Sequence, residues 1–426
     1  MTGEAGAMKP GNSPAEIERS GRFFYGWIIV CASFLVITTS FGVVYSFGVF
    51  LNPLREYFGS TSAAISGPYS FMVITYTSSG IFAGWAVDRY GPKITTMVGG
   101  LLLGSGLLLT SQVNTIWQLY VTFGLMGVGW SGAYSPMMTT ISRWFTRRKG
   151  LALGIISAGT GAGPLISAPL ATYLIATSGW RFAYIVIASA AIIVIAASFL
   201  MKKNPEEIGE LPDGKMYHSN ITQAKTGTGK ATVASGGLSL IEAIKTKSFW
   251  MLAAIFLLIG LGLQMVLAHI VAHSQIQGIS PLTAAAVLST ITGTSIAGRI
   301  IMGTTSDRIG RKRALAICLC GEGAMMFWLA GTSSPWMLFL FAVVFGFSYG
   351  GHVPQLPALA GENLGLAHMG VLLGSTAFFW GIGGAIGPVL AGRIVDVTGN
   401  YSSAFIVGGI AMFLAAGITF LLRKAF

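Results

Sequence analysis

Apolar segments long enough to cross a lipid bilayer recur along almost the whole chain. The 426-residue sequence is 53% hydrophobic and 9% charged, and its mean hydropathy is +0.71. About 20 apolar residues in a helix match the thickness of the hydrocarbon core, where only helices and closed barrels satisfy every backbone N–H and C=O group. The sequence therefore predicts an all-α membrane protein that crosses the bilayer many times.

Twelve such spans can be delimited. The first, from Trp27 to Leu51, is too long for the apolar region of a signal peptide, so we expect it to be retained. An even number of spans places both chain ends on one side of the membrane. The expected spans cover residues 25–51, 65–87, 94–112, 116–142, 150–175, 180–200, 248–274, 281–304, 314–332, 335–360, 369–394 and 401–422.

Lysine and arginine are distributed unevenly between the two sides. Of the 26 such residues, Arg55, Arg181 and Arg393 fall in loops on one side and Arg299 falls within a span, while the remaining 22 fall on the other side. Basic residues accumulate on the cytoplasmic side, so we expect a plasma (inner) membrane protein with both termini cytoplasmic. The +12 net charge then reflects topology and contact with membrane lipids, and does not indicate nucleic-acid binding.

A polar stretch from Lys202 to Lys247 separates the first six spans from the last six. Its Gly, Ser, Thr and Lys content is typical of a flexible linker. The predicted organisation is a cytoplasmic tail over 1–24, a six-helix bundle over 25–200, a cytoplasmic linker over 201–247, a second six-helix bundle over 248–422, and a cytoplasmic tail over 423–426.

Motifs for a nucleotide, a metal or a disulfide are weak. Thr226 to Lys230 contains a Gly-Lys pair, but no strand precedes it and the full phosphate-loop spacing is absent. Cys31, Cys318 and Cys320 lie in apolar runs, where packing is a simpler role than metal binding or disulfide formation. We therefore expect no cofactor, no metal and no ATP-driven mechanism.

The two halves of the chain repeat each other. Gly84 to Lys93 follows the second span and Gly303 to Lys312 follows the eighth, and both read Gly-x-x-x-Asp-Arg-x-Gly-x-Lys at a constant offset (303 − 84 = 312 − 93). Gly163-Pro164 and Gly387-Pro388 form a second pair at a similar offset (387 − 163). Internal repeats of helical halves are typical of secondary transporters, whose substrate sites lie between the repeats near the bilayer midplane. The repeated residues are Gly84, Asp88, Arg89, Gly91 and Lys93, and Gly303, Asp307, Arg308, Gly310 and Lys312.

Arg299 is the one basic residue expected well inside a span. A guanidinium there costs about 2.5–3.5 kcal/mol on insertion scales, which favours a functional role. Its planar fork can bind both oxygens of a carboxylate, which a lysine cannot do. The structural alternative is that Arg299, about 12 Å of helix from Asp307, reaches toward headgroups or a neighbouring carbonyl.

The repeated segment resembles the loop signature of the major facilitator superfamily. That resemblance covers almost the whole chain and implies twelve transmembrane helices in two pseudo-symmetric six-helix bundles. Gly42 to Leu54, Arg143 to Gly154 and His269 to His273 are in turn similar to the prokaryotic monocarboxylate porters and the oxalate:formate antiporter. In such carriers an arginine at the place of Arg299 pairs with the substrate carboxylate.

The same resemblance suggests further pocket residues. Tyr45 and Tyr134 match tyrosines that line the anion site of the antiporter, and Phe378 with its aromatic neighbours is expected to form an apolar wall. Ser375 stands where the antiporter has a second cation, so a single carboxylate is favoured over two. Thr160 replaces another tyrosine, which leaves room for lactate, pyruvate or a longer anion.

The usual proton-relay residues of the family are missing. Animal monocarboxylate carriers have an acid one turn before the arginine and a lysine in the first span, and Ser295 and approximately Val49 occupy those places. The remaining candidates are ionisable groups within spans, for which local hydrogen bonding is the structural alternative. These candidates are His269, His273, His352 and Glu322. If none carries a proton, the proton travels on the substrate or the carrier exchanges anions.

The prediction is a monomeric, non-enzymatic secondary transporter that moves small monocarboxylates such as lactate or pyruvate with a proton, by alternating access. An organic anion exchanger is the first alternative. A drug:proton antiporter is weaker, because the N-terminal spans contain no Asp or Glu before Asp88, although Gly150, Gly159 and Gly163-Pro164 fit its glycine spacing. A non-transporting receptor would need a signalling appendage, and a channel would need a charged ring or filter.

Overall fold

The structure is a computed structural model that describes residues 24–145, 148–211, 213, 215–216, 238–365 and 369–422. Several sequence predictions fall outside these residues. They are the N-terminal tail before Phe24, Thr226 to Lys230 in the linker, Arg147 in the Arg143 to Gly154 segment, and the tail over 423–426.

Nearly all of the described chain is helical, as the sequence predicted. The elements are α1 (Gly26–Tyr45), α2 (Phe47–Phe58), α3 (Ser62–Thr110), α4 (Ile116–Trp144), α5 (Lys149–Ser189), α6 (Ala191–Ser198), η1 (Pro205–Ile208), β1 (Glu210–Leu211), β2 (Lys215–Met216), α7 (Leu240–Ala243), α8 (Lys247–Ile276), α9 (Pro281–Ile309), α10 (Arg311–Ala330), α11 (Pro335–His352), α12 (Gln355–Leu364), α13 (Met369–Thr398) and α14 (Ser402–Leu421).

These helices form twelve spans within the described residues, because two long helices each contain two spans and three spans are each built from two helical segments. One of these three is the sixth span, in which the part of α5 after Gly179 continues into α6. The first span is α1 followed by α2, with a break at Ser46, and the tenth is α11 followed by α12, where Pro354 lacks an N–H group. In α3 and α5 two spans are joined at Gly91 and Gly179, whose φ angles of 82° and 80° are not helical. Nine described segments are long and apolar enough to cross a membrane, and Gly150–Ser198 counts as one although it turns at Gly179.

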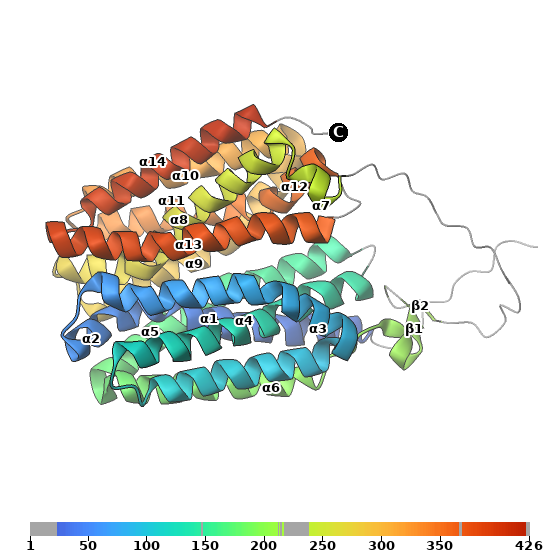
Figure 1. Ribbon diagram of the computed structural model, residues 1–426, viewed down its shortest axis with the longest axis horizontal. Coiled ribbons are helices and arrows are strands. Elements are labelled where there is room, and N and C mark those ends of the chain that lie inside the picture. Colours follow the sequence, from blue (N-terminus) through green and yellow to red (C-terminus); the bar gives the residue numbers. More distant parts are fainter. Residues whose placement is uncertain are drawn as a thin grey trace, which may run out of the picture.

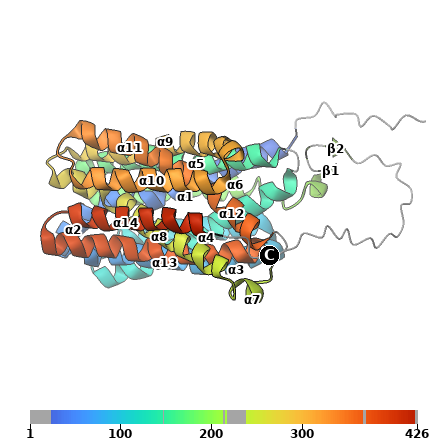
Figure 2. The ribbon, with the colours of Figure 1, turned by 90° about the horizontal axis from the view of Figure 1, so that it is seen from above.

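The spans are arranged in two six-helix bundles with roughly parallel helix axes. In Figure 1, α1 to α6 form the lower layer and α8 to α14 the upper one, and Figure 2 shows the same common axis from above. Figure 1 also places β1 and β2 at one end of the bundles and α2 at the other. We call these the Asp88 end and the Asp396 end. Asp88 lies in α3, three residues before the turn at Gly91, and Asp396 lies in the last turns of α13.

Glycines with positive φ confirm the internal repeat at the level of the backbone. A side chain other than hydrogen is strained in this region, so glycine suits these turns. Two pairs of these glycines occupy matching positions in the sequence repeat. The glycines of a third pair follow the first and seventh spans, and they are separated by the same number of residues as the signature loops (278 − 59 = 303 − 84). The pairs are Gly91 with Gly310 (82° and 90°), Gly179 with Gly399 (80° and 76°), and Gly59 with Gly278 (54° and 79°).

Two details of the predicted topology were wrong. The first span does not end at residue 51, because α2 continues to Phe58, burying Leu51 and Leu54 while Arg55 and Glu56 are at least partly exposed. Arg55, Arg181 and Arg393 do not lie in loops but in helices, near the ends that face the Asp396 end. Apolar run length alone missed these amphipathic helix ends.

The linker contains a two-stranded hairpin in which Glu210 pairs with Met216.

Candidate functional site

Arg299 lies in α9, which packs closely against helices of both bundles. Ser280 caps the start of α9 by accepting a hydrogen bond from the Thr283 N–H (3.2 Å), and Pro281 occupies the first turn. A Cβ atom on Gly350 of α11 would lie 1.9 Å from the Ser295 carbonyl oxygen, and one on Gly161 of α5 would lie 2.4 Å from that of Thr292. These glycines therefore bring α9 against its own bundle and against the other, and place Arg299 between the two.

Arg299 is paired only with neutral oxygen atoms. Its Nη1 donates to the carbonyl oxygen of Ser157 in α5 (2.6 Å), and its Nη2 donates to the hydroxyl of Tyr349 in α11 (3.4 Å), whose ring centroid lies 5.6 Å from Cζ. Its buried Nε has no hydrogen-bond partner, and no carboxylate of the described residues forms an ion pair with it. A half-buried guanidinium in this state can still accept an anionic partner.

Tyr349 contacts the guanidinium, and two further tyrosines expected from the sequence interact with Arg299 or with Tyr349. Tyr45 of α1 is buried and interacts with Tyr349, while Tyr134 of α4 interacts electrostatically with Arg299. Phe41 packs edge-on against both Tyr45 (5.5 Å) and Tyr134 (5.6 Å). The sequence did not single out Tyr349, although its position three residues before His352 in a glycine-rich segment was a usable indication. We call Tyr45, Tyr134, Arg299 and Tyr349 the central cluster.

Ser375 and Phe378 lie in α13, and no described contact joins them to the central cluster. The Ser375 hydroxyl donates to the Val371 carbonyl oxygen of its own helix (2.8 Å). Phe378 is 41% exposed and packs against Phe379 (6.3 Å), which in turn contacts Trp250 of α8. Their participation in substrate binding stays a prediction.

His269 is buried in a hydrogen-bond network at the Asp396 end. Its Nε2 lies 2.8 Å from the Pro388 carbonyl oxygen, which can only accept, so we assign the ring proton to Nε2. Nδ1 then accepts from the Tyr401 hydroxyl (3.0 Å), and Ser66 of the other bundle lies 3.2 Å from Nε2. Both ring nitrogens are satisfied by a neutral imidazole, as the structural alternative expects.

His273 is also buried and lies closer to the Asp396 end. Its Nε2 is 3.0 Å from the side-chain nitrogen of Gln277 and 3.3 Å from the Thr332 hydroxyl. The ring packs edge-on against Phe405 (4.9 Å). Neither His269 nor His273 has a described contact with the central cluster.

The two bundles are joined at the Asp396 end by several hydrogen bonds. The Asp396 carboxylate of α13 accepts from the backbone N–H groups of Ser62 (2.8 Å) and Ala63 (2.9 Å) at the start of α3. A carboxylate at a helix N-terminus is favoured by both the free N–H groups and the helix dipole. The side chains of Asn52 and Gln275 join α2 to α8 nearby (2.5 Å). The bundles are therefore held together at this end.

The first signature loop, at the Asp88 end, is organised by Asp88. Its carboxylate pairs with Arg143 of α4 (2.7 Å), and its carbonyl oxygen accepts from Lys203 Nζ (2.5 Å). Arg89 lies over the rings of Trp85 and Tyr90, and Lys93 lies 4.8 Å from the Phe199 ring centroid. A Cβ on Gly84 would meet nothing within 4 Å, so this glycine makes no close helix contact in the described structure.

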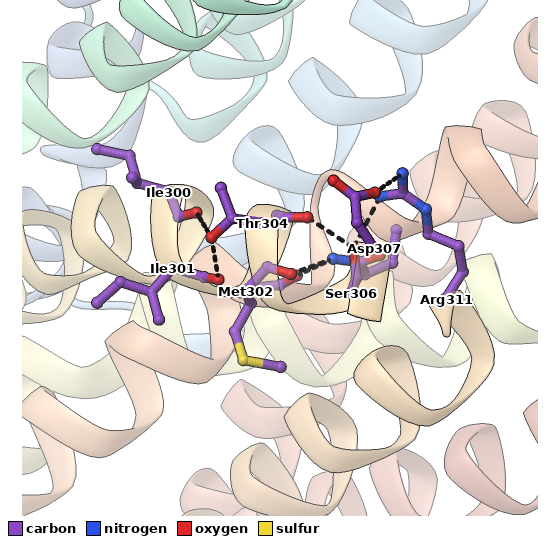
Figure 3. Close-up of polar contacts among 10 residues, drawn as sticks. Ile300, Ile301, Met302, Thr304, Ser306, Asp307 and Arg311 are labelled. Carbon is purple, nitrogen blue, oxygen red and sulfur yellow. Dashed lines mark hydrogen bonds and ion pairs between the residues drawn. The ribbon is translucent and has the colours of Figure 1, made fainter. Parts of the chain in front are cut away.

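The second signature loop has the same shape but different ion pairs. Asp307 pairs with Arg311, one turn along the chain, and Arg311 Nη1 also donates to the Ser306 hydroxyl (2.7 Å) across the Gly310 turn (Figure 3). Lys312 donates to the Leu422 carbonyl oxygen after α14. Gly303 has only Pro354 near its added Cβ, at 3.9 Å, and Arg308 lies in the last turn of α9.

Glu322 and His352, predicted separately, are brought together. His352 Nδ1 lies 2.6 Å from Glu322 Oε1, and the side chains are 2% and 0% exposed. They join α10 to the end of α11 within one bundle. No group of three or more His, Cys, Asp or Glu among the described residues is placed to hold a metal ion.

Comparisons with known proteins agree with this architecture. The family model of the Major Facilitator Superfamily matches residues 33–304 and 274–425. Monocarboxylate transporter 13 is 27% identical over 405 residues in Bos taurus and 28% identical over 408 in Rattus norvegicus, in both cases over 94% of this chain and 90% of the relative. Monocarboxylate transporter 11 of Mus musculus is 28% identical over 394 residues, 90% of this chain and 84% of its own.

Solved structures show the same fold at low sequence identity. A bacterial homologue of the human lysosomal transporter Spinster, in an inward-facing and unoccupied conformation, superposes with a TM-score of 0.68 at 14% identity, covering 94% of this chain and 96% of the other. The family match extends over far more than half of the sequence. The chain is therefore a multi-pass membrane transporter that belongs to the Major Facilitator Superfamily and is related in sequence to monocarboxylate transporters, and it is not an enzyme.

Proposed function

We propose that the protein is a secondary carrier of small monocarboxylates such as lactate or pyruvate, and that Arg299 binds the substrate carboxylate. The observation that carries the proposal is the incomplete pairing of Arg299, whose guanidinium donates, among the described residues, to the Ser157 carbonyl and the Tyr349 hydroxyl and to no carboxylate. A charge within a span is costly, and a bidentate carboxylate partner would offset that cost. The names of the relatives support the same substrate class.

The central cluster fits one carboxylate better than two. Arg299 is its one guanidinium, and the tyrosines contribute hydroxyl groups and ring surfaces. A phenol donates to a carboxylate, hydroxyl or keto oxygen, while its ring packs against a methyl group. A dicarboxylate would leave its second charge without a cation in a poorly hydrated site. Ser375 and Phe378 are further candidates for the wall of this site.

The proposed cycle is alternating access of the two bundles, over residues 25–200 and 248–422, around Arg299. In the described state the Asp396 end is closed by Asn52, Asp396 and Gln275. We propose that the protein lies in the plasma (inner) membrane and that the Asp88 end faces the cytoplasm, because lysine and arginine are in excess there. The linker and both termini are then on the cytoplasmic side. We propose that the monomer is the working unit and that its partners are the monocarboxylate, a proton and membrane lipids.

Proton symport and anion exchange are the two coupling modes to distinguish. Symport is the proposal, because the second bundle holds a buried pair of ionisable side chains in Glu322 and His352. Exchange requires no protonatable group in the protein. A pH gradient without substrate inside the vesicles drives accumulation by a symporter only.

The test is counterflow of labelled L-lactate and pyruvate in proteoliposomes. We expect exchange by the wild type and a loss of about 100-fold or more in Arg299→Ala, equal to roughly 2.7 kcal/mol or more of binding. Arg393→Ala, which changes an exposed arginine in α13, is the matched control and keeps wild-type exchange. Absence of exchange by the wild type for every monocarboxylate tried, or normal exchange by Arg299→Ala, contradicts the proposal.

A further inference from the structure

We propose that Glu322 and His352 together form the proton-binding site of the transport cycle, and that Tyr349 links this site to the substrate-binding guanidinium of Arg299. This inference rests on the proposed function. It assigns the coupling ion to one pair of side chains in α10 and α11, away from the hydrogen-bonded histidines at the Asp396 end.

The pair is in direct hydrogen-bond contact through one carboxyl oxygen, and the other carboxyl oxygen has no partner. Glu322 and His352 are 0% and 2% exposed, and their Oε1 and Nδ1 atoms are 2.6 Å apart. The second carboxyl oxygen, Oε2 of Glu322, is buried and has no hydrogen-bond partner in the described structure. A buried ion pair that only joins helices needs both carboxylate oxygens satisfied to offset desolvation. Oε2 is therefore open to take a proton.

Two of the charge states of the pair are used in the proposed cycle, those with one and with two added protons. With one shared proton the pair is neutral, whether the proton is drawn on the carboxyl group or on the imidazole. A second proton, placed on the unpartnered Oε2 while the imidazole is protonated, gives the pair a charge of +1. Loss of that proton returns the neutral pair. The site thus gains and releases one proton per cycle without any covalent change.

Tyr349 provides the physical connection to the substrate. It lies one turn before His352 on α11, with ring centroids 5.7 Å apart, and it receives the hydrogen bond from Arg299 on the other side. When a carboxylate neutralises Arg299, the positive field at the pair falls and a second proton binds more readily. By linkage, the proton raises the affinity for the anion by the same factor. Anion and proton are then carried together.

The ionisable groups around the pair are few. Cys318 of α10 lies beside Glu322, and Tyr349 of α11 and Arg299 of α9 are linked to the pair through the contacts of Tyr349. The other charged residues of α9 and α10 lie at the helix ends around Gly310; they are Asp307, Arg308, Arg311, Lys312 and Arg313. Helix α14, which also packs on α10, has no ionisable side chain, and the acidic residue of α12, Glu362, is exposed. Among these groups Arg299 is the one fixed charge, and Tyr349 contacts both Arg299 and His352.

The test separates exchange from proton-driven accumulation in proteoliposomes. For Glu322→Gln and His352→Gln we expect counterflow of labelled lactate at equal pH within about threefold of the wild type, and accumulation driven by an inward proton gradient reduced about tenfold or more. His273→Gln is the matched control, a second buried histidine of the same bundle, and keeps both activities. Gradient-driven accumulation that survives Glu322→Gln, or a wild type that exchanges but never accumulates, overturns the inference and leaves carboxylate transport intact.

A measurement on the wild type covers the case in which the variants do not fold. Adding lactate to purified wild-type protein in weakly buffered detergent should cause proton uptake and increase the infrared band of a protonated carboxylic acid. Glu322→Asp should shift that band. Substrate binding without proton uptake and without a carboxylic-acid band overturns the inference, whereas failure of lactate and pyruvate to bind at all contradicts the proposed function instead.

Discussion

Arg299 of one bundle donates a 2.6 Å hydrogen bond to the backbone carbonyl oxygen of Ser157 in the other. The hydrogen bond of the guanidinium therefore depends on the relative position of the two bundles. The acceptor is fixed to the backbone of α5, so a separation of α5 from α9 that exceeds the reach of the Arg299 side chain breaks the bond. If Arg299 binds the substrate as proposed, substrate binding and bundle movement involve the same side chain.

The first prediction concerns the shape of the charged group. Arg299→Lys keeps the charge but cannot bond Ser157 and both carboxylate oxygens at once. We expect lactate counterflow to fall by about 10- to 100-fold, with most of the loss in apparent affinity, because a bidentate pair contributes about 1.5–3 kcal/mol. Arg393→Lys should behave as the wild type. Retention of wild-type affinity by Arg299→Lys would show that the substrate carboxylate is not bound by two nitrogen atoms of the guanidinium at once.

Tyr349→Phe tests the hydroxyl that faces Arg299. The 3.4 Å contact is long, so we expect the apparent affinity for the monocarboxylate to fall by only about 3- to 10-fold, equal to roughly 0.5–1.5 kcal/mol. The maximal exchange rate should change little. Tyr173→Phe, an exposed tyrosine of α5, serves as the control in the same counterflow assay. An unchanged affinity in Tyr349→Phe would remove this hydroxyl from the site.

Asp396→Ala tests the hydrogen bonds that close the Asp396 end. Removal of a capping carboxylate costs about 0.5–2 kcal/mol, which increases the population open at this end by about 2- to 30-fold. The measurement is disulfide cross-linking between Asn52→Cys and Gln275→Cys after replacement of the native cysteines, and its rate should fall in proportion to the loss of the closed population. Ser402→Ala, which loses only a bond within the second bundle, should cross-link at the original rate.

Gly310→Ala tests the turn of the second signature loop. At φ 90° and ψ 143° an alanine is strained by about 1–3 kcal/mol, so the apparent Tm in detergent should fall by several degrees. Gly303→Ala is the control, because its Cβ would meet only Pro354 at 3.9 Å. Equal melting temperatures for the two variants would contradict a conformational role for Gly310.

The spans and the repeat could be predicted from the sequence because both depend on local properties. Apolar run length located all twelve spans, and identical residues at a constant offset located the signature loops. The extension of the first span through α2 could not be found this way, because Asn52, Arg55 and Glu56 interrupt the apolar run while Leu51 and Leu54 remain buried. Run length does not detect a helix with one polar face.

The candidate site was predictable only in part. Arg299 is anomalous by itself, so a single residue in an apolar run was enough to find it. The contacts of Tyr349 with Arg299 and of His352 with Glu322 depend on how α9, α10 and α11 are rotated about their axes. That rotation is set by glycine contacts such as Gly350 against the Ser295 carbonyl, which spacing along one helix does not reveal.

The Asp396 cap has a kinetic consequence. In the proposed cycle this carboxylate must leave the first turn of α3 each time the Asp396 end opens. If the transition state for opening has already lost the cap, each 1.4 kcal/mol of cap stability slows that step about tenfold. The maximal transport rate would then be limited by hydrogen bonds at a helix terminus and not by the contacts of Arg299. A weaker cap would increase this rate and would also increase the fraction of molecules that are open at the Asp396 end in the resting state.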